Sequence, residues 1–268
     1  NNFLKFRASW GRVGNDRLKD ENGNDIRFPY LTTLGNVSST WGTGLAENRT
    51  GSMNLKWEVS TKTNFGIDAR FFDDKVDMTV DFFHTKTTDI FQRRANIPDE
   101  GGLSNVLPYA NIGSMKSWGM DGTLAYTHTF NKDMALTVRG NFTHAENEVI
   151  YWEQSGVNYP YQSNSGVPYK VQRGLIALGL FKDEDDIKSS PKQTFMDNYR
   201  PGDIKYKDVN GDGKIDKDDV VPLNYSAVPF IQYGFALDWN YKAFRVSILF
   251  EGVSKVQYFK VVGDSILS

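Results

Sequence analysis

The chain has 268 residues, of which 39% are hydrophobic and 14% aromatic, and a formal net charge of −2. This charge gives no basis for binding nucleic acid, and the absence of cysteine excludes disulfides, thiolate zinc sites and cysteine nucleophiles. Mean hydropathy is −0.50, and no apolar run approaches the roughly 18 residues of a transmembrane helix. These values do not exclude membrane-spanning strands, since each strand needs only about 10 residues and turns every second side chain to lipid.

The first predicted strand covers residues 4–10. Leu4, Phe6, Ala8 and Trp10 alternate there with polar residues, which is the two-residue period of a strand with one apolar face. The chain begins without an initiator methionine or a leader segment. We therefore expect it to be part of a longer protein, with a partner for this strand upstream.

Three long hairpins follow. Apolar and polar residues alternate over 56–71, and the alternation resumes at 76–85 after a short polar turn. The same pattern joins 118–130 to 134–142 and joins 231–241 to 244–250, each across a turn of two or three residues. These patterns predict an all-β, antiparallel protein.

The predicted connections alternate between tight turns and long loops, the loops covering 11–54, 88–117 and 149–228. Outer-membrane barrels have short turns at one end and long extracellular loops at the other. Aromatic residues near strand ends are typical of membrane–water interfaces, although a soluble β core with aromatic edges would also place them there. These aromatic residues are Trp57, Phe71, Phe72, Trp118, Phe130, Trp239, Tyr241 and Phe244.

If the apolar stripes face lipid, the polar stripes face the barrel lumen. A register slip of one residue would exchange the two faces. The lumen-facing candidates are Lys62, Asp68, Asp121, Arg139 and Asp238.

Residues 208–219, inside the last long loop, have the spacing of an EF-hand calcium loop, with a glycine at its sixth position. Position 12 is an aspartate where an EF-hand has glutamate, so weaker binding is expected. Prolines flank the loop instead of helices, and a bare acidic turn is the alternative. The predicted calcium ligands are Asp208, Asn210, Asp212, Lys214 through its carbonyl, Asp216 and Asp219. The acidic run at 183–186 is expected to be solvated surface.

No motif indicates catalysis. The sequence has no GxSxG elbow, HExxH pair, phosphate-binding lysine loop or GxGxxG turn. Paired acids of the glycosidase type could come from any of the 33 carboxylates, and no pair is singled out. We therefore predict that the protein is not an enzyme.

Several motifs resemble the C-terminal part of SusC/RagA-type TonB-dependent transporters. They are LKWEVSTKTNFGID at 55–68, DFFHTKTTD at 81–89, NIGS at 111–114, GMDG at 119–122 and PGDIKYKDVNGDG at 201–213. The resemblance implies an outer-membrane barrel of about 22 strands with an N-terminal plug, energised by the TonB complex. It further implies a SusD-like surface lipoprotein as partner and import of glycan or peptide oligomers. Residues 1–268 would then be a partial C-terminal barrel region of seven or eight strands, too few to close the barrel.

The alternative is a soluble or surface-displayed binding module for carbohydrate, stabilised by calcium. Trp41, Trp152 or Tyr161 would stack on sugar rings in such a module. The two hypotheses differ in what covers the apolar stripes, which is lipid in a barrel and a second sheet in a soluble module.

Overall fold

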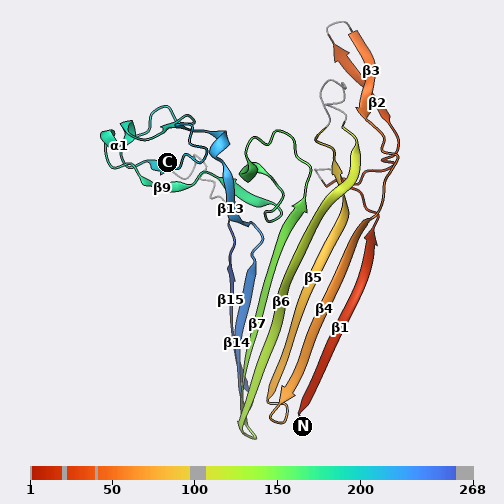
Figure 1. Cartoon of the computed structure of the whole chain (residues 1–268). Helices are drawn as coiled ribbons and strands as arrows, with labels where there is room; N and C mark the ends of the chain where they lie inside the picture. The colour runs from red at the N-terminus through yellow and green to blue at the C-terminus, as the bar shows by residue number, and fades with distance from the viewer. Residues whose placement is uncertain (1, 20–22, 40–41, 97–106, 258–268) are drawn as a thin grey trace.

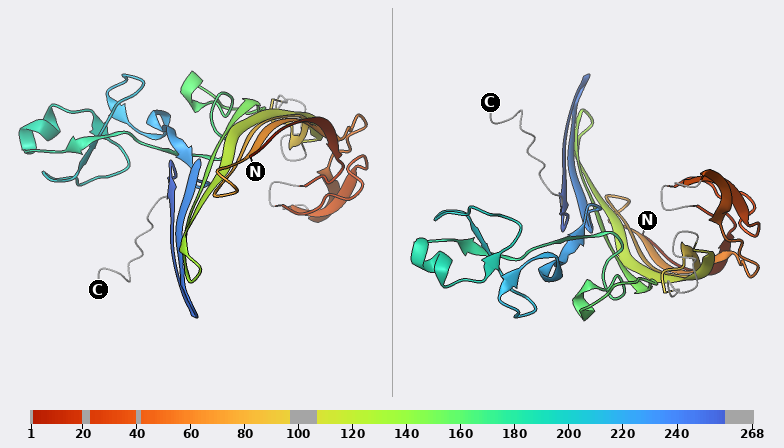
Figure 2. Two further views of the ribbon diagram at one scale, coloured as in Figure 1. Left: turned by 90° about the horizontal axis from the view of Figure 1, so that it is seen from below. Right: turned by 90° about the horizontal axis from the view of Figure 1, so that it is seen from above.

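The computed structural model describes residues 2–19, 23–39, 42–96 and 107–257. Seven strands of this part form one antiparallel sheet in the order β1-β4-β5-β6-β7-β14-β15 (Figure 1). Seen along the strands, the sheet curves as an arc (Figure 2). Its strands are β1 (Phe3–Asn15), β4 (Glu58–Phe71), β5 (Val76–Arg93), β6 (Tyr109–Asn131), β7 (Met134–Tyr151), β14 (Ile231–Tyr241) and β15 (Phe244–Ser254).

The three predicted hairpins are confirmed, with their turns together at one end of the sheet (Figure 1). In the β4–β5 turn Phe72, Asp73 and Asp74 have φ angles of 59°, 55° and 62°. In the two-residue β14–β15 turn Lys242 has a φ of 50°. Such left-handed residues let a short turn match the twist of the strands it joins.

Several strands are longer than predicted. Strand β1 continues to Asn15, β5 continues to Arg93 and β6 begins at Tyr109, so the predicted loops at 11–54 and 88–117 were too long. Beyond the apolar region the alternation stops while the backbone ladder continues, because the consecutive residues Phe91 and Gln92 are both buried, at 7% and 5% exposure. A shift in register between Thr87 and Ile90 further hides the period.

The long connections carry small elements of their own. A hairpin of β2 (Thr33–Ser39) and β3 (Gly42–Arg49) follows β1. The connection from β7 to β14 lies to one side of the sheet, at the end away from the turns (Figure 1), and Ile215 is fully buried within it. Its elements are η2 (Pro160–Gln162), β8 (Val171–Gly174), β9 (Ala177–Leu180), α1 (Glu184–Lys188), β10 (Lys192–Gln193), β11 (Ile204–Tyr206), β12 (Lys214–Ile215), η3 (Lys217–Asp219) and β13 (Val221–Ser226). Among the described residues, no helix is long and apolar enough to span a membrane.

Candidate functional site

The strand register assigns every side chain of the sheet to one of two faces. Directly paired residues share a face, as do alternate residues along one strand. Asp68 pairs with Thr79, and Asp81, two residues further along β5, pairs with Asp121. Extending the pairing through β7 to β14 brings the remaining candidates onto the same surface. This polar face carries all five predicted lumen residues, Lys62, Asp68, Asp121, Arg139 and Asp238.

An ion-pair network joins three strands on the polar face. Arg7 Nε donates to Asp68 Oδ2 at 2.9 Å, and Arg7 Nη2 donates to Asp81 Oδ2 at 2.8 Å. Gly66 lies between these groups, and a Cβ atom there would lie 2.4 Å from Asp81 Oδ1. The glycine therefore makes room for the network. Arg7 and Asp81 were not among the predicted residues, although their parity places them on this face.

A second network surrounds Asp238, whose side chain is 6% exposed. It pairs with Arg139, accepts a hydrogen bond from Ser247 Oγ at 2.5 Å, and lies 3.5 Å from Arg245 Nη2. Both arginines are more than half exposed, so the unused N–H groups of their guanidinium ions face solvent. An open groove of about 800 Å³ runs along these residues. The polar face can therefore hydrogen-bond a passing solute without any covalent chemistry.

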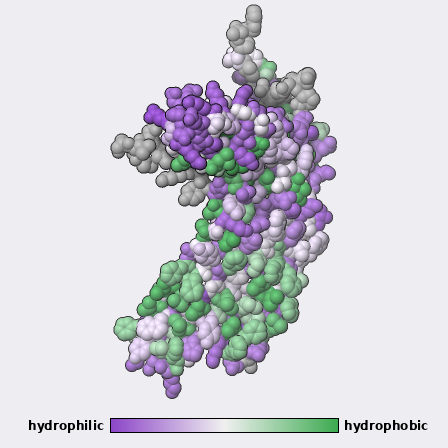
Figure 3. Space-filling model, turned by 60° about the vertical axis from the view of Figure 1, so that its left-hand side comes forward, coloured by the Kyte–Doolittle hydropathy of each residue, from purple (hydrophilic) through white to green (hydrophobic). Residues whose placement is uncertain are grey.

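The opposite face is apolar and largely uncovered. Phe6 is 63% exposed and Phe250 62%, and no second sheet covers them in the described part of the chain. Apolar side chains gather over the turn-side half of this face (Figure 3). This is the arrangement expected for lipid contact, and the soluble-module alternative would require a covering sheet.

Aromatic residues bound the apolar region at both ends. One cross-strand row holds Trp10, His84 and Trp118, and a row ten positions along β6 holds His128 and Trp239. Ten residues at about 3.3 Å each, tilted by about 40°, span about 25 Å. That length equals the height of the apolar band of outer-membrane barrels, about 25 Å.

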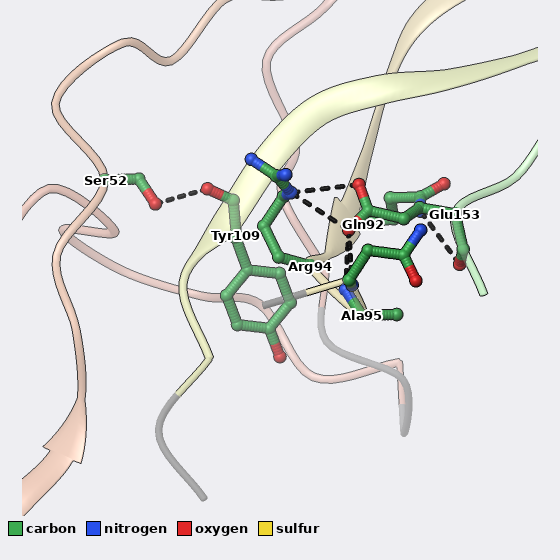
Figure 4. Close-up of polar contacts among 7 residues, drawn as sticks. Ser52, Gln92, Arg94, Ala95, Tyr109 and Glu153 are labelled. Carbon is green, nitrogen blue, oxygen red and sulfur yellow. Dashed lines mark hydrogen bonds and ion pairs between the residues drawn. The ribbon is translucent and has the colours of Figure 1, made fainter. Parts of the chain in front are cut away.

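At the end of the sheet away from the turns, Glu153 holds several segments together (Figure 4). Its side chain is 4% exposed, pairs with Arg94 Nε at 2.9 Å and accepts hydrogen bonds from the backbone N–H groups of Ala95 and Asn96 at 2.9 and 2.7 Å. Burial opposes ionisation, but these donors outweigh it and lower the pKa of Glu153. Gln92 Nε2 also donates to the Glu153 carbonyl at 3.4 Å. No sequence pattern pointed to this cluster.

In the acidic loop, the predicted ligands bind the backbone. Asp208 accepts hydrogen bonds from the N–H groups of Gly211 and Gly213 at 2.6 and 2.8 Å. Asp219 is fully buried and accepts from Val209 and Asp216 at 2.7 and 2.9 Å. Asn210 and Asp212 likewise accept backbone hydrogen bonds within the loop. Within the described residues, no three Asp, Glu, His or Cys side chains converge as a metal-binding group. The oxygen donors suit calcium, but their geometry is that of a hydrogen-bonded turn.

Two of the three aromatic residues suggested as sugar platforms lie in the described part of the chain, and each contacts a tyrosine ring. Trp152 lies beside Tyr169, with ring centroids 6.1 Å apart, and Tyr161 stacks on Tyr159 at 5.3 Å. The Tyr161 hydroxyl donates to the Asp218 carbonyl at 2.6 Å, so this ring braces the acidic loop. Trp41 lies outside the described residues.

A curved antiparallel sheet with one polar and one apolar face, and an apolar band of this height, is part of the wall of an outer-membrane β-barrel. Residues 1–264 match the family described as "TonB dependent receptor-like, beta-barrel", and the chain belongs to that family. This is a family of transporters, which confirms both the predicted outer-membrane location and the prediction that the protein is not an enzyme.

The chain is similar to SusC/RagA-type proteins, as its motifs indicated. It is 28% identical to TonB-dependent receptor P26 of Formosa agariphila, over 93% of this chain and 25% of that protein. It is 25% identical to TonB-dependent receptor SusC of Bacteroides thetaiotaomicron, over 81% of this chain and 21% of SusC. The RagAB peptide importer in its "open-open" state shares the fold, with a TM-score of 0.68, 23% identity and coverage of 94% of this chain and 26% of that chain. The chain thus spans about a quarter of the relatives it matches.

Proposed function

We propose that the full-length protein imports nutrient oligomers, glycans or peptides, across the outer membrane with energy supplied through TonB. The observation that carries this proposal is the sheet with an apolar outer face and a hydrogen-bonding inner face that holds Lys62, Asp68, Asp121, Arg139 and Asp238. In this proposal the polar face lines the lumen and the long connections form the extracellular mouth. The structurally similar RagAB complex is a peptide importer, which supports the choice of oligomeric substrates.

We also propose a SusD-like lipoprotein as partner at the extracellular mouth. The connection between β7 and β14 supports this, because it extends to one side of the barrel wall and offers a folded surface beyond the strands. Co-purification of the full-length protein from outer membranes with a lipoprotein is the expected result. Purification of the barrel alone under mild detergent conditions would contradict it.

Uptake measurements test the importer directly. Cells that lack the gene should fail to accumulate one class of labelled oligomer, either glycan or peptide, and should recover uptake when the gene is restored. Because the energy comes through TonB, dissipating the proton gradient should abolish that uptake. If the deletion strain accumulates both classes to the same level as the parent strain, the proposal is contradicted.

We propose, from its oxygen donor set alone, that the loop at 208–219 binds calcium. Calorimetric titration of the full-length protein should then show calcium binding that is lost in an Asp208→Ala, Asp212→Ala double variant, while the barrel still assembles. Lys217→Ala, within the loop but outside the donor set, serves as the control. The absence of calcium-dependent heat in the unaltered protein would mean that the loop is a hydrogen-bonded acidic turn.

A further inference from the structure

A row of four charged residues and one threonine lies just beyond the aromatic row on the apolar side of the sheet. The register places one residue from each of five adjacent strands in this row. All of them have the parity of the apolar face, two residues past Trp10 and Trp118 towards the long connections. The row consists of Arg12, Thr61, Lys86, Lys116 and Glu148.

The row contains more positive than negative charge. Lys116 is neutralised by Glu148 at 3.0 Å, and its ammonium group lies over the ring of Trp118 at 5.3 Å from the centroid. In the part of the chain that the structure describes, no ion pair joins Arg12 or Lys86 to a carboxylate. Lys86 on β5 also pairs directly with Lys116 on the neighbouring strand β6, and like charges in that position repel. An anion beside Lys86 would relieve this repulsion.

The spacing of the strands allows one anion to meet both unpaired cations. Arg12 and Lys86 lie on either side of Thr61, and two inter-strand steps of about 4.8 Å separate their backbones by about 10 Å. Both side chains are exposed and long enough to reach a group held above Thr61, whose hydroxyl can donate a third hydrogen bond. Phosphate oxygens accept such hydrogen bonds from arginine and lysine.

We propose that Arg12, Thr61 and Lys86 bind the phosphate of an anionic lipid headgroup. The position of the row identifies the source of the phosphate, since the apolar band ends at the aromatic row and headgroups lie immediately beyond it. Acyl chains of the same lipid would lie on the exposed rings of Phe6 and Phe82. The inference rests on the proposed function, in which the apolar face is the outer face of the barrel.

Lipid binding to the full-length protein in detergent tests the site, with native mass spectrometry as the readout. Cations near an anionic lipid surface contribute about 1 kcal/mol each, so Arg12→Gln with Lys86→Gln should weaken phosphatidylglycerol binding about 30-fold. Lys5→Gln with Lys62→Gln removes two cations from the opposite face and should leave lipid binding unchanged. Phosphatidylcholine, which has no net charge, should bind equally weakly to all three proteins.

Two results would overturn the lipid site. One is equal phosphatidylglycerol binding by the outer-face double variant and the unaltered protein. The other is displacement of the lipid by millimolar inorganic phosphate, which would indicate a site for a free anion. Heat-modifiable migration of the same samples separates this inference from the proposed function, because its absence in the unaltered protein would contradict the barrel itself.

Discussion

Replacing Leu124 by arginine tests which face of the sheet meets lipid. Leu124 is 52% exposed and belongs to the apolar face, while its neighbour Thr123 belongs to the polar face. The same change at these two adjacent positions adds the same charge on opposite sides of one strand. We expect Leu124→Arg to destabilise the barrel strongly and Thr123→Arg to have little effect.

The magnitude follows from the depth of Leu124 in the apolar band. It lies four residues from His128, which marks the turn-side edge of the apolar band. At about 3.3 Å per residue and a strand tilt of about 40°, Leu124 is about 10 Å from that edge of a band about 25 Å high. Leu124 is therefore within about 3 Å of the midplane, where an arginine facing lipid costs about 2–4 kcal/mol. This corresponds to a decrease of about 30- to 1,000-fold in the ratio of folded to unfolded protein.

Urea titration of the full-length protein in lipid vesicles, followed by heat-modifiable migration, measures this difference. The midpoint for Leu124→Arg should fall well below that of the unaltered protein, and the midpoint for Thr123→Arg should remain close to it. If Thr123→Arg is the more damaging change, the two faces have been assigned the wrong way round. If both changes are harmless, the sheet does not face lipid at all.

Three further predictions concern backbone space, pH and turn geometry. Gly66→Ala should reduce assembly in the outer membrane because its Cβ would lie 2.4 Å from Asp81 Oδ1, whereas Gly11→Ala, with no atom within 4 Å, should assemble normally. Because the pKa of Glu153 is lowered in the folded protein, its stabilising effect is complete above its ordinary value of 4.5 and is lost as the pH falls through the folded value. Protection from hydrogen exchange at residues 149–155, measured relative to the intrinsic exchange rate at each pH, should therefore fall at acidic pH in the unaltered protein, and in Glu153→Gln it should be low at every pH. Lys242→Gly should raise the free energy of unfolding by up to about 1 kcal/mol, and with it the urea midpoint, because glycine adopts the left-handed turn conformation without strain; an unchanged midpoint would contradict this.

The sequence alone predicted the sheet best where one face meets lipid and the other meets water. The alternation over 56–71 and 231–241 arises from that contrast, and strands β4 and β14 lie there with the expected turns. The pattern disappears where a register shift follows Thr87 and the consecutive residues Phe91 and Gln92 are both buried, which is why the end of β5 and the start of β6 were assigned to a loop. Hydrophobic periodicity depends on the environment of the side chains. It does not show whether backbone hydrogen bonds continue beyond the alternating segment.

The polar face could be identified from parity, but its ion pairs could not. Asp68 was a candidate from its position in the alternation, whereas its partner Arg7 lies 61 residues away in the sequence and meets it only because β1 pairs with β4. The cluster around Glu153 was missed for the same reason, since its donors come from the end of β5 and the residues that follow. Contacts between distant segments depend on strand order, which alternation does not encode.

Register must be held firmly in this sheet because a one-residue slip would move Asp68 and Asp238 into lipid. Glycine–aromatic pairs contribute to that specificity. A Cβ on Gly252 would lie 2.5 Å from the ring of Tyr233, its direct partner across β14 and β15, so the ring fits only against a residue without a side chain. A slip would set Tyr233 against Glu251 or Val253 and lose this fit. The ion pairs on the polar face also favour this register, since they form in only one register. The charged residues of the polar face therefore also select the fold.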